Sequence, residues 1–414
     1  MTFLYTIGIL LFRLGVQLAV PFSPKAAQWV RGRRRLFAQL RQALSARGSR
    51  PLAWVHCASL GEFEQGRPVI EAIRAQHPEY FVLVTFFSPS GYEVRKGYRG
   101  ADHVCYLPAD LPRSARRFVR MVQPTVAIFV KYELWYHHLR ALRSVGARVY
   151  LISAIFSREQ AFFNRALGAF FVRMLHMCEH IFVQTKGSLP LLAELGVHHA
   201  SYAGDTRFDR VLAVAASAHA LPQLADFAQG QTVIVAGSTW APDERLLADL
   251  VNHTPGLKLI VAPHEVSEGG VRHTLALMHK PAITHSAWQQ SPGAGLAGYS
   301  VFVVDAVGFL SSLYRFGTIA YVGGGFGVGI HNTLEAAVYG IPVIFGTNYR
   351  SFAEAVDLVA LGGAYSVGSL PELQHAVGAL RSNHALRERS GDACRRYVQQ
   401  HGGATEVVMK KIFG

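Results

Sequence analysis

Short apolar runs alternate with amphipathic stretches along most of the chain, and this alternation predicts buried strands separated by helices. In the first half, the expected strands are 52–57, 81–87, 125–130, 148–152 and 180–183. Segments 67–76 and 113–122 lie between strands and have the apolar spacing of helices. Strands that alternate with helices form βαβ units, so we expect a parallel sheet in this half.

The pattern weakens over residues 211–231, which are rich in alanine, and a second series of the same kind follows. Its expected strands are 232–236, 257–261, 301–304, 319–322 and 342–345. A helix over 332–339 opens directly from a glycine run, and the chain from Pro371 onward is expected to be helical. The two α/β halves predict two Rossmann-like domains, 25–215 and 225–414, that face each other across a cleft. In such sheets, ligands bind at the carboxyl ends of the strands.

The first 24 residues have a different pattern and are expected to form a membrane anchor. Residues 1–22 carry one charge, Arg13, among Leu, Ile, Val and Phe. About 20 apolar residues can span a bilayer, but a central arginine costs roughly 2.5–3.5 kcal/mol on insertion. An early basic region and a small-residue cleavage site, the marks of a signal peptide, are both missing. We therefore interpret the segment as an uncleaved anchor that either spans the membrane or lies in its interface, and a buried helix of the first domain is the alternative.

The charge balance supports a membrane partner. The chain has 41 Lys plus Arg against 27 Asp plus Glu, a net charge of +14. Seven arginines and no acid occur between residues 31 and 50: Arg31, Arg33, Arg34, Arg35, Arg41, Arg47 and Arg50. Placed after an anchor, they are expected to face anionic headgroups on the cytoplasmic side of the inner membrane. Nucleic acid is disfavoured as a partner, because this stretch has no interleaved stacking aromatic residue beyond Phe37.

The four cysteines indicate no catalytic or metal-binding function. Cys57, Cys105, Cys178 and Cys394 contain no C-x-x-C pair, so they indicate neither a disulfide scaffold nor a zinc site. They are typical of buried thiols in a reducing cytosol.

Glu62 is the first candidate for chemistry. It lies in WVHCASLGEFEQG, where a strand runs into Ser59, Gly61 turns the chain and a helix starts near Glu64. A carboxylate at the end of a strand can act as a general base. The spacing Ser59-x-x-Glu62 also fits a capping box that only starts the helix. The residues alone leave both interpretations open.

The glycine run over residues 322–335 is the second candidate. Five glycines follow a buried strand, and Asn332 or Thr333 starts a helix. Free amides and a helix dipole make a phosphate site, and Glu335 is placed to reach a ribose hydroxyl. No Gly-Lys-Ser/Thr follows, so the run is not a P-loop. A tight structural turn with Asn332 as the cap is the alternative.

Further polar segments also follow expected strands, and each is a weak signal by itself. They are FFSPSG with Ser88, Ser90 and Gly91, KYELW with Glu133, GDTRFD with Arg207, AGST with Ser238, and APHE with Pro263 and His264. A lone histidine such as His264 is more often a hydrogen-bonded structural residue than a ligand. Their shared placement at strand ends is what favours a binding site.

Taken in order, these motifs resemble the Kdo transferases, which attach 3-deoxy-D-manno-octulosonic acid (Kdo) to lipid A precursors. The resemblance rests on WVHCASLGEFEQGRP, FFSPSG, KYELW, GDTRFD, AGSTW, APHE, VVDAVG and GGGFGVGIHNTLE, and it covers nearly the whole chain. It implies a GT-B fold, a CMP-Kdo donor and a lipid A precursor, lipid IVA, as acceptor. It implies no metal and no cofactor, in keeping with the lack of a D-x-D motif.

The resemblance also assigns residues. Glu62 matches the catalytic carboxylate, and Glu133 an acid near the acceptor or donor sugar. Further substrate contacts fall on Ser88, Ser90, Gly91, Arg207 and Ser238. Nucleotide contacts fall on Pro263, His264, Val307, Gly308, Phe309, Asn332, Thr333, Leu334 and Glu335. The chain departs from the family around His264, where an arginine is missing, and at Phe309, where many members have Glu.

The expected reaction is a single inverting displacement. Glu62 takes the proton of the acceptor hydroxyl as its oxygen attacks the anomeric carbon of Kdo. CMP leaves, and Arg207 with the Ser88–Gly91 turn holds the Kdo carboxylate. A GT-B enzyme with another nucleotide sugar and a non-catalytic module at the membrane surface remain as rival interpretations.

Overall fold

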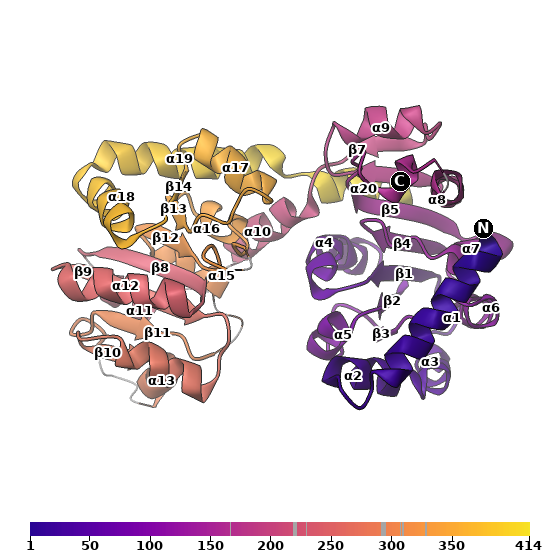
Figure 1. The fold of residues 1–414 in the computed structure, drawn as a ribbon, viewed down its shortest axis with the longest axis horizontal. Coiled ribbons are helices and arrows are strands. Elements are labelled where there is room, and N and C mark those ends of the chain that lie inside the picture. The colour runs from indigo at the N-terminus through magenta and orange to yellow at the C-terminus, as the bar shows by residue number, and fades with distance from the viewer. Residues whose placement is uncertain are drawn as a thin grey trace. The chain divides into compact units, whose positions relative to one another are not determined.

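Two compact α/β units make up the protein. The computed structural model describes residues 1–165, 167–217, 222–228, 230–290, 295–306, 308, 310–327 and 329–414. The first unit contains Met1–Arg210 and Gly402–Gly414, and the second contains Val211–His401. In each unit helices cover both faces of a sheet (Figure 1). The prediction of two α/β domains with parallel sheets is confirmed, whereas the sequence pattern placed residues 402–414 in the second domain.

The first unit is built on a parallel sheet with the strand order β3-β2-β1-β4-β5-β6-β7. The strands are β1 Leu52–Cys57, β2 Phe81–Phe86, β3 His103–Tyr106, β4 Val126–Val130, β5 Arg148–Ala154, β6 His180–Val183 and β7 Ala200–Tyr202. The five strands expected in this half all form, and β3 and β7 are additional. Strand β7 has three residues, none of them buried, so it contains no apolar run that a pattern could indicate.

Alternate residues of each strand face two different cores. In β1, Leu52 and Trp54 pack against one layer of helices, and Ala53, Val55 and Cys57 against the other. The first layer contains α3 Leu36–Ser45, α6 Pro112–Val122, α7 Tyr136–Ser144, α8 Gly168–Leu175 and α9 Ser188–Glu194. The second contains α4 Leu60–Gln76 and α20 Ala404–Phe413, and α5 Pro89–Arg95 packs beside α4. A short turn, η1 Ala161–Phe163, precedes α8.

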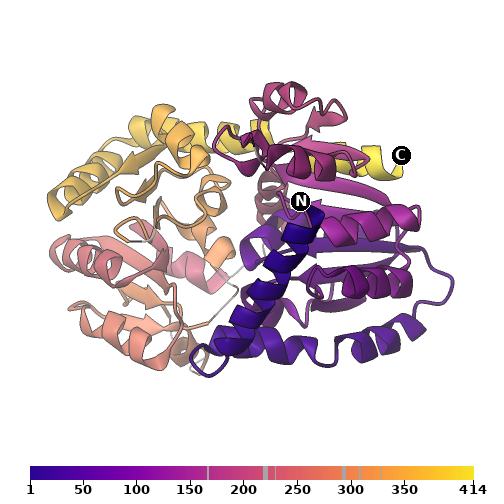
Figure 2. The same ribbon diagram turned by 45° about the vertical axis from the view of Figure 1, so that its right-hand side comes forward.

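The N-terminal segment is a helix that runs along the outside of the first unit, α1 Thr2–Leu18, followed by α2 Pro24–Arg33 (Figure 2). Hydroxyls on one side of α1 bond the first unit: Tyr5 donates to Asp110 at 2.6 Å, and Thr2 donates to Tyr136 at 3.3 Å. No residue of α1 is buried. None of the helices in the described ranges combines the length and apolar character that a membrane crossing needs.

Three of the seven arginines expected at a membrane instead hold the first unit together. Arg33 donates to the carbonyl oxygens of Leu107 and Phe87, each at 2.8 Å, and its guanidinium lies 3.8 Å above the Trp29 ring. Arg47 donates to the Val122 carbonyl at 2.6 Å, and Arg50 pairs with Asp102 at 3.1 Å. The other four are exposed: Arg31, Arg34, Arg35 and Arg41.

The second unit repeats the design of the first with the strand order β10-β11-β9-β8-β12-β13-β14, again parallel. The strands are β8 Thr232–Thr239, β9 Leu257–Pro263, β10 Ala282–Thr284, β11 Val301–Val303, β12 Ile319–Val322, β13 Val343–Phe345 and β14 Ala364–Ser366. The helices and turns are α11 Pro222–Ala228, α12 Ala241–His253, α13 Glu268–Ala276, α14 His285–Gln289, α15 Leu310–Leu313, η2 Tyr314–Phe316, α16 Leu334–Ala337, α17 Ala353–Ala360, α18 Leu370–Ser382 and α19 His384–His401. Helix α10 Thr206–Ser217 begins in the first unit and ends in the second.

The helix expected over 332–339 is wrong in its extent, because α16 is a single turn, Leu334–Ala337. The chain leaves it at Gly340, which adopts a left-handed φ of 68°, and Pro342 follows two residues later. Both features end a helix, since proline lacks the amide hydrogen that a helix needs.

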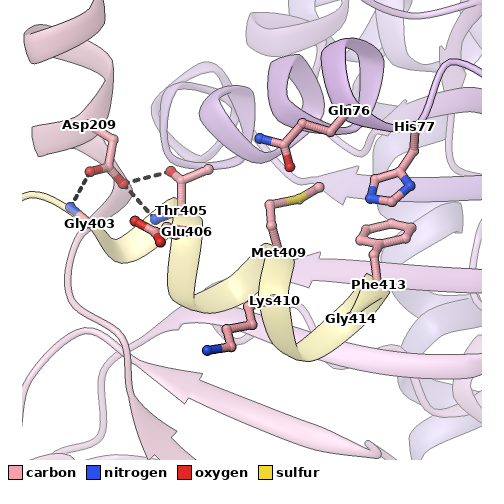
Figure 3. A pocket seen from close by; sticks show the side chains of 10 residues that line it. All are labelled: Gln76, His77, Asp209, Gly403, Thr405, Glu406, Met409, Lys410, Phe413 and Gly414. Carbon is pink, nitrogen blue, oxygen red and sulfur yellow. Dashed lines mark hydrogen bonds between the residues drawn. The ribbon is translucent and has the colours of Figure 1, made fainter.

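The last helix, α20, belongs to the first unit. Asp209 accepts hydrogen bonds from the amides of Gly403 and Thr405, at 2.5 and 2.6 Å, and so caps the start of α20 (Figure 3). At the far end of α20, Phe413 stacks on His77 with ring centroids 4.5 Å apart. The helix borders a surface cavity of about 820 Å³ beside the C-terminal end of α4. Glu62 lies at the opposite end of α4, so this cavity is separate from the candidate catalytic residue.

Candidate active site

The strand order of the first unit marks where a ligand should bind. The chain builds β2 and β3 on one side of β1, and β4 to β7 on the other. A crevice forms outside the carboxyl ends of the two strands at such a reversal, here β1 and β4. Glu62 follows β1 and Glu133 follows β4. The sheet therefore brings to one place two carboxylates that are 71 residues apart in sequence.

Glu62 occupies the first turn of α4, and its carboxylate accepts a hydrogen bond from the amide of Ala58, the residue that directly follows β1. Burial is the main cause that raises the pKa of Glu62, to about 7, and the negative charge of Glu133 raises it further. Hydrogen bonds from backbone amides, led by that of Ala58, and the charge of Lys131 oppose this shift. A carboxylate with a pKa near 7 is suited to accept a proton at neutral pH.

The capping interpretation of Glu62 is half right. Ser59 is the N-cap residue of α4, but within the described residues its side chain makes no capping hydrogen bond. The Glu62 carboxylate does reach back and accept from the Ala58 amide. That bond fixes the carboxylate at the strand end without using all of its acceptor positions. Capping and proton abstraction are therefore compatible roles for the same side chain.

The loop after β4 presents Glu133 next to two aromatic side chains. Lys131 starts the loop with a left-handed φ of 62°, which is costly for a residue other than glycine and is typical of functional sites. The indole N–H of Trp135 donates to Glu133 at 3.0 Å and to Nε2 of His56 at 3.2 Å. His56 is a fully buried residue of β1.

The predicted substrate residues Ser88, Ser90 and Gly91 lie after β2, at the same edge of the sheet. Ser88 caps α5, and its amide donates to the Ala58 carbonyl at 2.7 Å, which places this turn beside the start of α4. The hydroxyls of Ser88 and Ser90 lie 2.9 Å apart. Gly91 has a structural reason to be glycine, since a Cβ there would overlap the Phe86 ring.

Arg207 lies at the start of α10 and is ion-paired. Its Nη2 and Nε approach Asp205 Oδ2 at 2.7 and 2.8 Å, and Gln184 donates to the same oxygen at 2.6 Å. Thr206 donates to the Gln65 carbonyl of α4 at 2.5 Å, which joins this loop to the helix that carries Glu62. Asp205 therefore orients the Arg207 guanidinium, which the sequence analysis expects to bind an anionic group.

In the second unit the reversal lies between β8 and β12, and Ser238 sits at the end of β8 with a left-handed φ of 53°. The buried carboxylate of Asp243 ties the two strand ends together. It accepts from the amides of Trp240 and Gly324, each at 2.9 Å, and from the Tyr321 hydroxyl at 2.8 Å. The loop after β8 and the glycine loop after β12 are thus held by one side chain.

Three aromatic rings gather at this edge of the second sheet. The rings of Trp240 and His331 are nearly parallel, with planes 11° apart, and the Trp240 indole N–H donates to His331 Nε2 at 3.1 Å. His264 stacks on both, with ring centroids 4.5 Å from Trp240 and 4.4 Å from His331. Burial is the main cause that lowers the pKa of His331, so this ring is neutral at neutral pH. The predicted His264 is exposed at the top of the stack, where a planar base could reach it.

The glycine loop is more structural than its sequence indicated. A Cβ on Gly323 would overlap the Ser238 carbonyl oxygen, so the loop needs glycine where the strand ends meet. Most of its amides are used in internal hydrogen bonds. The amides of Gly327 and Gly329 both donate to the Gly324 carbonyl, and that of His331 donates to the Gly323 carbonyl. The remaining bonds run from Gly323 to Gly237, from Gly324 to Asp243 and from Ile330 to Asn348. The expected cradle of free amides before a helix is therefore wrong for these positions.

The four residues after the loop divide into two pairs. Thr333 and Leu334 are buried in the unit and face away from solvent. Asn332 and Glu335 are half-buried, and the Asn332 amide donates to Glu335 at 3.1 Å. Of the sequence-predicted nucleotide residues here, Asn332 and Glu335 are the two that a ligand can reach.

The remaining predicted nucleotide contacts lie on two other loops. Pro263 is the buried last residue of β9, directly before His264. Gly308 adopts a left-handed φ of 95° after β11. Val307 and Phe309 lie outside the described residues.

Four residues of the two sites were not singled out from the sequence: His56, Trp135, Trp240 and His331. Each lies inside a motif that follows or ends a strand, and this placement was the available signal. Their roles depend on hydrogen bonds between residues 79 and 91 positions apart, which a local pattern does not reveal.

Comparisons with known proteins agree with this geometry. The sequence profile of the 3-deoxy-D-manno-octulosonic-acid transferase (kdotransferase) family matches residues 31–210. The 3-deoxy-D-manno-octulosonic acid transferase of Bordetella pertussis is 28% identical over 415 residues, which span 93% of this chain and 94% of the relative. The enzyme of the same name from Haemophilus influenzae is 26% identical over 371 residues, 86% of this chain and 85% of the relative.

A solved structure shares the fold. The UDP-GlcNAc 2-epimerase from Neisseria meningitidis bound to UDP-GlcNAc superposes with a TM-score of 0.60 at 14% identity, over 87% of this chain and 99% of that protein. The two parallel-sheet units resemble those of GT-B glycosyltransferases. The family model over residues 31–210 and the curated relatives over most of the chain show that this protein is similar to the 3-deoxy-D-manno-octulosonic acid transferases, and they support a glycosyltransferase activity.

Proposed function

We propose that this protein is an inverting glycosyltransferase that moves Kdo from CMP-Kdo to a lipid A precursor, lipid IVA, in lipopolysaccharide core synthesis. The observation that carries the proposal is Glu62, a carboxylate with a pKa near 7 at the reversal point of the first sheet. Similarity to the Kdo transferases supports the reaction class, and Glu62 is the proposed base for that reaction.

The proposed reaction is one displacement. The acceptor hydroxyl oxygen forms a bond to the anomeric carbon of Kdo while Glu62 takes its proton. The bond between that carbon and the phosphate oxygen of CMP breaks, and CMP departs with the electron pair. Attack from the face opposite the leaving group inverts the anomeric centre.

We assign the acceptor and the Kdo sugar to the first unit. Ser88, Ser90 and Glu133 lie at the same sheet edge as Glu62 and offer hydroxyl and carboxylate partners for sugar hydroxyls. Arg207, oriented by Asp205, is the proposed partner of the Kdo carboxylate, because a guanidinium binds carboxylates in a planar, directional way.

We assign the CMP moiety to the second unit. The ring cluster of Trp240, His264 and His331 offers a flat apolar surface for a base, and Glu335 a carboxylate for a ribose hydroxyl. Pro263, Gly308 and Asn332 frame the same sheet edge.

We further propose that the enzyme works at the cytoplasmic face of the inner membrane, with α1 lying in the interface. The polar side of α1 is bonded to the first unit, and its apolar residues point outward: Phe3, Leu4, Leu11, Leu18 and the following Phe22 are 62–88% exposed. A helix with such a face binds the headgroup–acyl boundary, and arginines 31, 34, 35 and 41 add attraction to anionic lipid.

The membrane proposal is tested by co-sedimentation with vesicles that contain anionic phospholipid. Wild-type protein should sediment with the vesicles, and a Leu4→Glu/Leu11→Glu variant should remain largely in solution. Val407→Glu, which changes an exposed apolar residue on α20, is the matched control and should bind like wild type. Equal binding by the α1 variant and the control would contradict an interfacial role for α1.

The transfer proposal is tested with detergent-solubilised protein, CMP-Kdo generated in situ and a tetra-acylated lipid A precursor, with products read by mass spectrometry. A mass gain of one or more Kdo units is expected. If no gain occurs with CMP-Kdo shown to be present, competition by CMP and by UDP against other nucleotide sugars would show whether another donor is used.

A further inference from the structure

We propose that His56 and Trp135 are positioning residues that together fix the Glu133 carboxylate at the end of β4, the strand that pairs with the β1 strand preceding Glu62. The inference rests on the proposed role of Glu62 as the base. It adds two residues, one of them deep in the sheet, that touch neither reacting atom.

His56 is the fixed end of the arrangement. Its side chain is 0% exposed, and Nδ1 lies 2.8 Å from Thr85 Oγ1 and 3.2 Å from the Thr85 carbonyl oxygen. Thr85 is the residue paired with His56 across β1 and β2, and it is also fully buried. Burial lowers the pKa of His56, and this effect exceeds the opposing effect of Glu133, so the ring is neutral.

The contacts also fix which ring nitrogen carries the proton. An indole N–H can only donate, and that of Trp135 points at His56 Nε2 at 3.2 Å. Nε2 must therefore be the acceptor, and the single proton of the neutral ring sits on Nδ1, facing the Thr85 oxygens. His56 thus acts as a rigid acceptor anchored in the sheet.

Trp135 links this anchor to Glu133. The same indole N–H donates to Glu133 Oε2 at 3.0 Å, and His56 Nε2 lies 3.7 Å from that oxygen. The indole is also stacked on Phe87, with ring centroids 4.7 Å apart and planes 29° apart. Because the Trp135 ring is held by Phe87 on its face and by His56 at its nitrogen, it keeps the Glu133 carboxylate in one place.

The charge so placed acts on Glu62. The titratable and charged groups that face Glu62 are Glu133 and Lys131 from the loop after β4 and the buried Cys57 thiol of β1. After burial, Glu133 is the largest cause that raises the pKa of Glu62, and Lys131 opposes it more weakly. When two neighbouring carboxylates have different environments, their pKa values move apart, and the one with the raised pKa can act as a base near neutral pH. If Glu133 were free to turn toward solvent, Glu62 would become a weaker base.

The test is Trp135→Phe, which keeps a ring to stack on Phe87 and removes only the N–H. Trp29→Phe is the matched control. Trp29 packs on the same Phe87 ring with centroids 5.9 Å apart, and its indole N–H has no hydrogen-bond partner in the described part of the chain. Glu133→Gln removes the charge itself and sets the largest shift to be expected. Two readouts are needed for each variant: the pH profile of kcat/KM, and the midpoint of the Glu62 carboxyl in a ¹³C NMR titration.

Both midpoints should fall by about one pH unit in Trp135→Phe and by at least as much in Glu133→Gln, the usual size of a nearby like-charge effect. Trp29→Phe should titrate like wild type. A shift in Glu133→Gln without one in Trp135→Phe would overturn the positioning pair, as would an equal shift in Trp29→Phe. No shift in Glu133→Gln would overturn the tuning.

In a His56→Gln variant that folds, the Glu62 midpoint should shift in the same direction as in Trp135→Phe, because glutamine lacks the fixed ring nitrogen that accepts from Trp135. An unchanged midpoint would count against the role of His56. The NMR midpoint does not depend on transfer. A wild-type protein that shows the midpoint near 7 and the variant shifts, but no Kdo transfer, would refute the proposed function and leave the coupling of the two carboxylates intact.

Discussion

Glu62→Gln should make the protein more stable above neutral pH while it removes the proposed base. The folded protein keeps Glu62 partly desolvated and near the charge of Glu133, so ionising it is unfavourable relative to the unfolded chain. A glutamine at this position carries no charge at any pH, and its amide oxygen can still accept from the Ala58 amide. The substitution therefore relieves the electrostatic cost and retains the hydrogen bond.

The size of the effect follows from the change in the pKa of Glu62, from 4.5 to about 7. A folded-state pKa above the unfolded value means that folding favours the protonated form, so the full stability is present below the unfolded pKa and is lost as pH rises to about 7. At about 1.36 kcal/mol per pKa unit, the loss approaches about 3.4 kcal/mol at high pH, and solvent screening of this partly accessible carboxylate reduces it. Between pH 5 and pH 8 the free energy of unfolding of the wild type should fall by about 2 kcal/mol relative to Glu62→Gln.

The assay is urea-induced unfolding of both proteins at pH 5 and pH 8, compared as a difference of differences so that all other titrating groups cancel. Glu64→Gln is the control, because Glu64 lies on the same helix but is paired with Arg95 at 2.8 Å. A Glu62→Gln protein whose stability relative to wild type is the same at both pH values would contradict this prediction. The carboxylate would then have an ordinary proton affinity and no special fitness as a base.

Three further predictions concern activity and the second unit. The kcat/KM of the wild type should rise about tenfold per pH unit below pH 7 and level off above it, as measured by transfer assays from about pH 5.5 to 8.5; a flat profile would contradict the pKa of Glu62 near 7. Asp243→Ala, which removes the acceptor of three hydrogen bonds, should cost about 2–3 kcal/mol in urea unfolding, and Asp243→Asn, which keeps one acceptor oxygen, clearly less; equal effects would argue against those bonds. Gly323→Ala should cost about 1–3 kcal/mol through backbone overlap. Gly327→Ala in the same loop would place its Cβ 4.0 Å from the Gly324 carbonyl oxygen, an ordinary contact, and should be near neutral in thermal unfolding; similar melting temperatures would refute the close approach at Gly323.

The strand pattern was sufficient for the architecture because the central strands of both sheets are apolar runs buried on both faces. Leu52–Cys57, His180–Val183 and Ile319–Val322 form over the residues that the pattern indicated. The reversal points, and with them the positions of Glu62 and Glu133, follow from strand order, which local pattern does not contain. The return of Gly402–Gly414 to the first unit likewise depends on a distant partner, Asp209, that caps the last helix.

The errors concerned residues whose local sequence had two physical explanations. The glycine run suggested free amides, but the loop uses glycine so that its backbone can approach Ser238 closely. Arg33 is part of a basic stretch, yet it is bonded to two carbonyl oxygens within the first unit. In both cases the deciding contact is with a residue more than 50 positions away, so composition could not distinguish the two explanations.

Transfer of Kdo by Glu62→Gln and Glu64→Gln, measured side by side with wild type at pH 8 by mass spectrometry of the lipid product, tests the proposed mechanism at its critical step. Glu64→Gln should retain activity within a few-fold, and Glu62→Gln should lose roughly 10²–10⁴-fold in kcat while remaining folded, the usual contribution of a general base. Turnover by Glu62→Gln close to that of wild type would contradict the proposal that this carboxylate takes the acceptor proton.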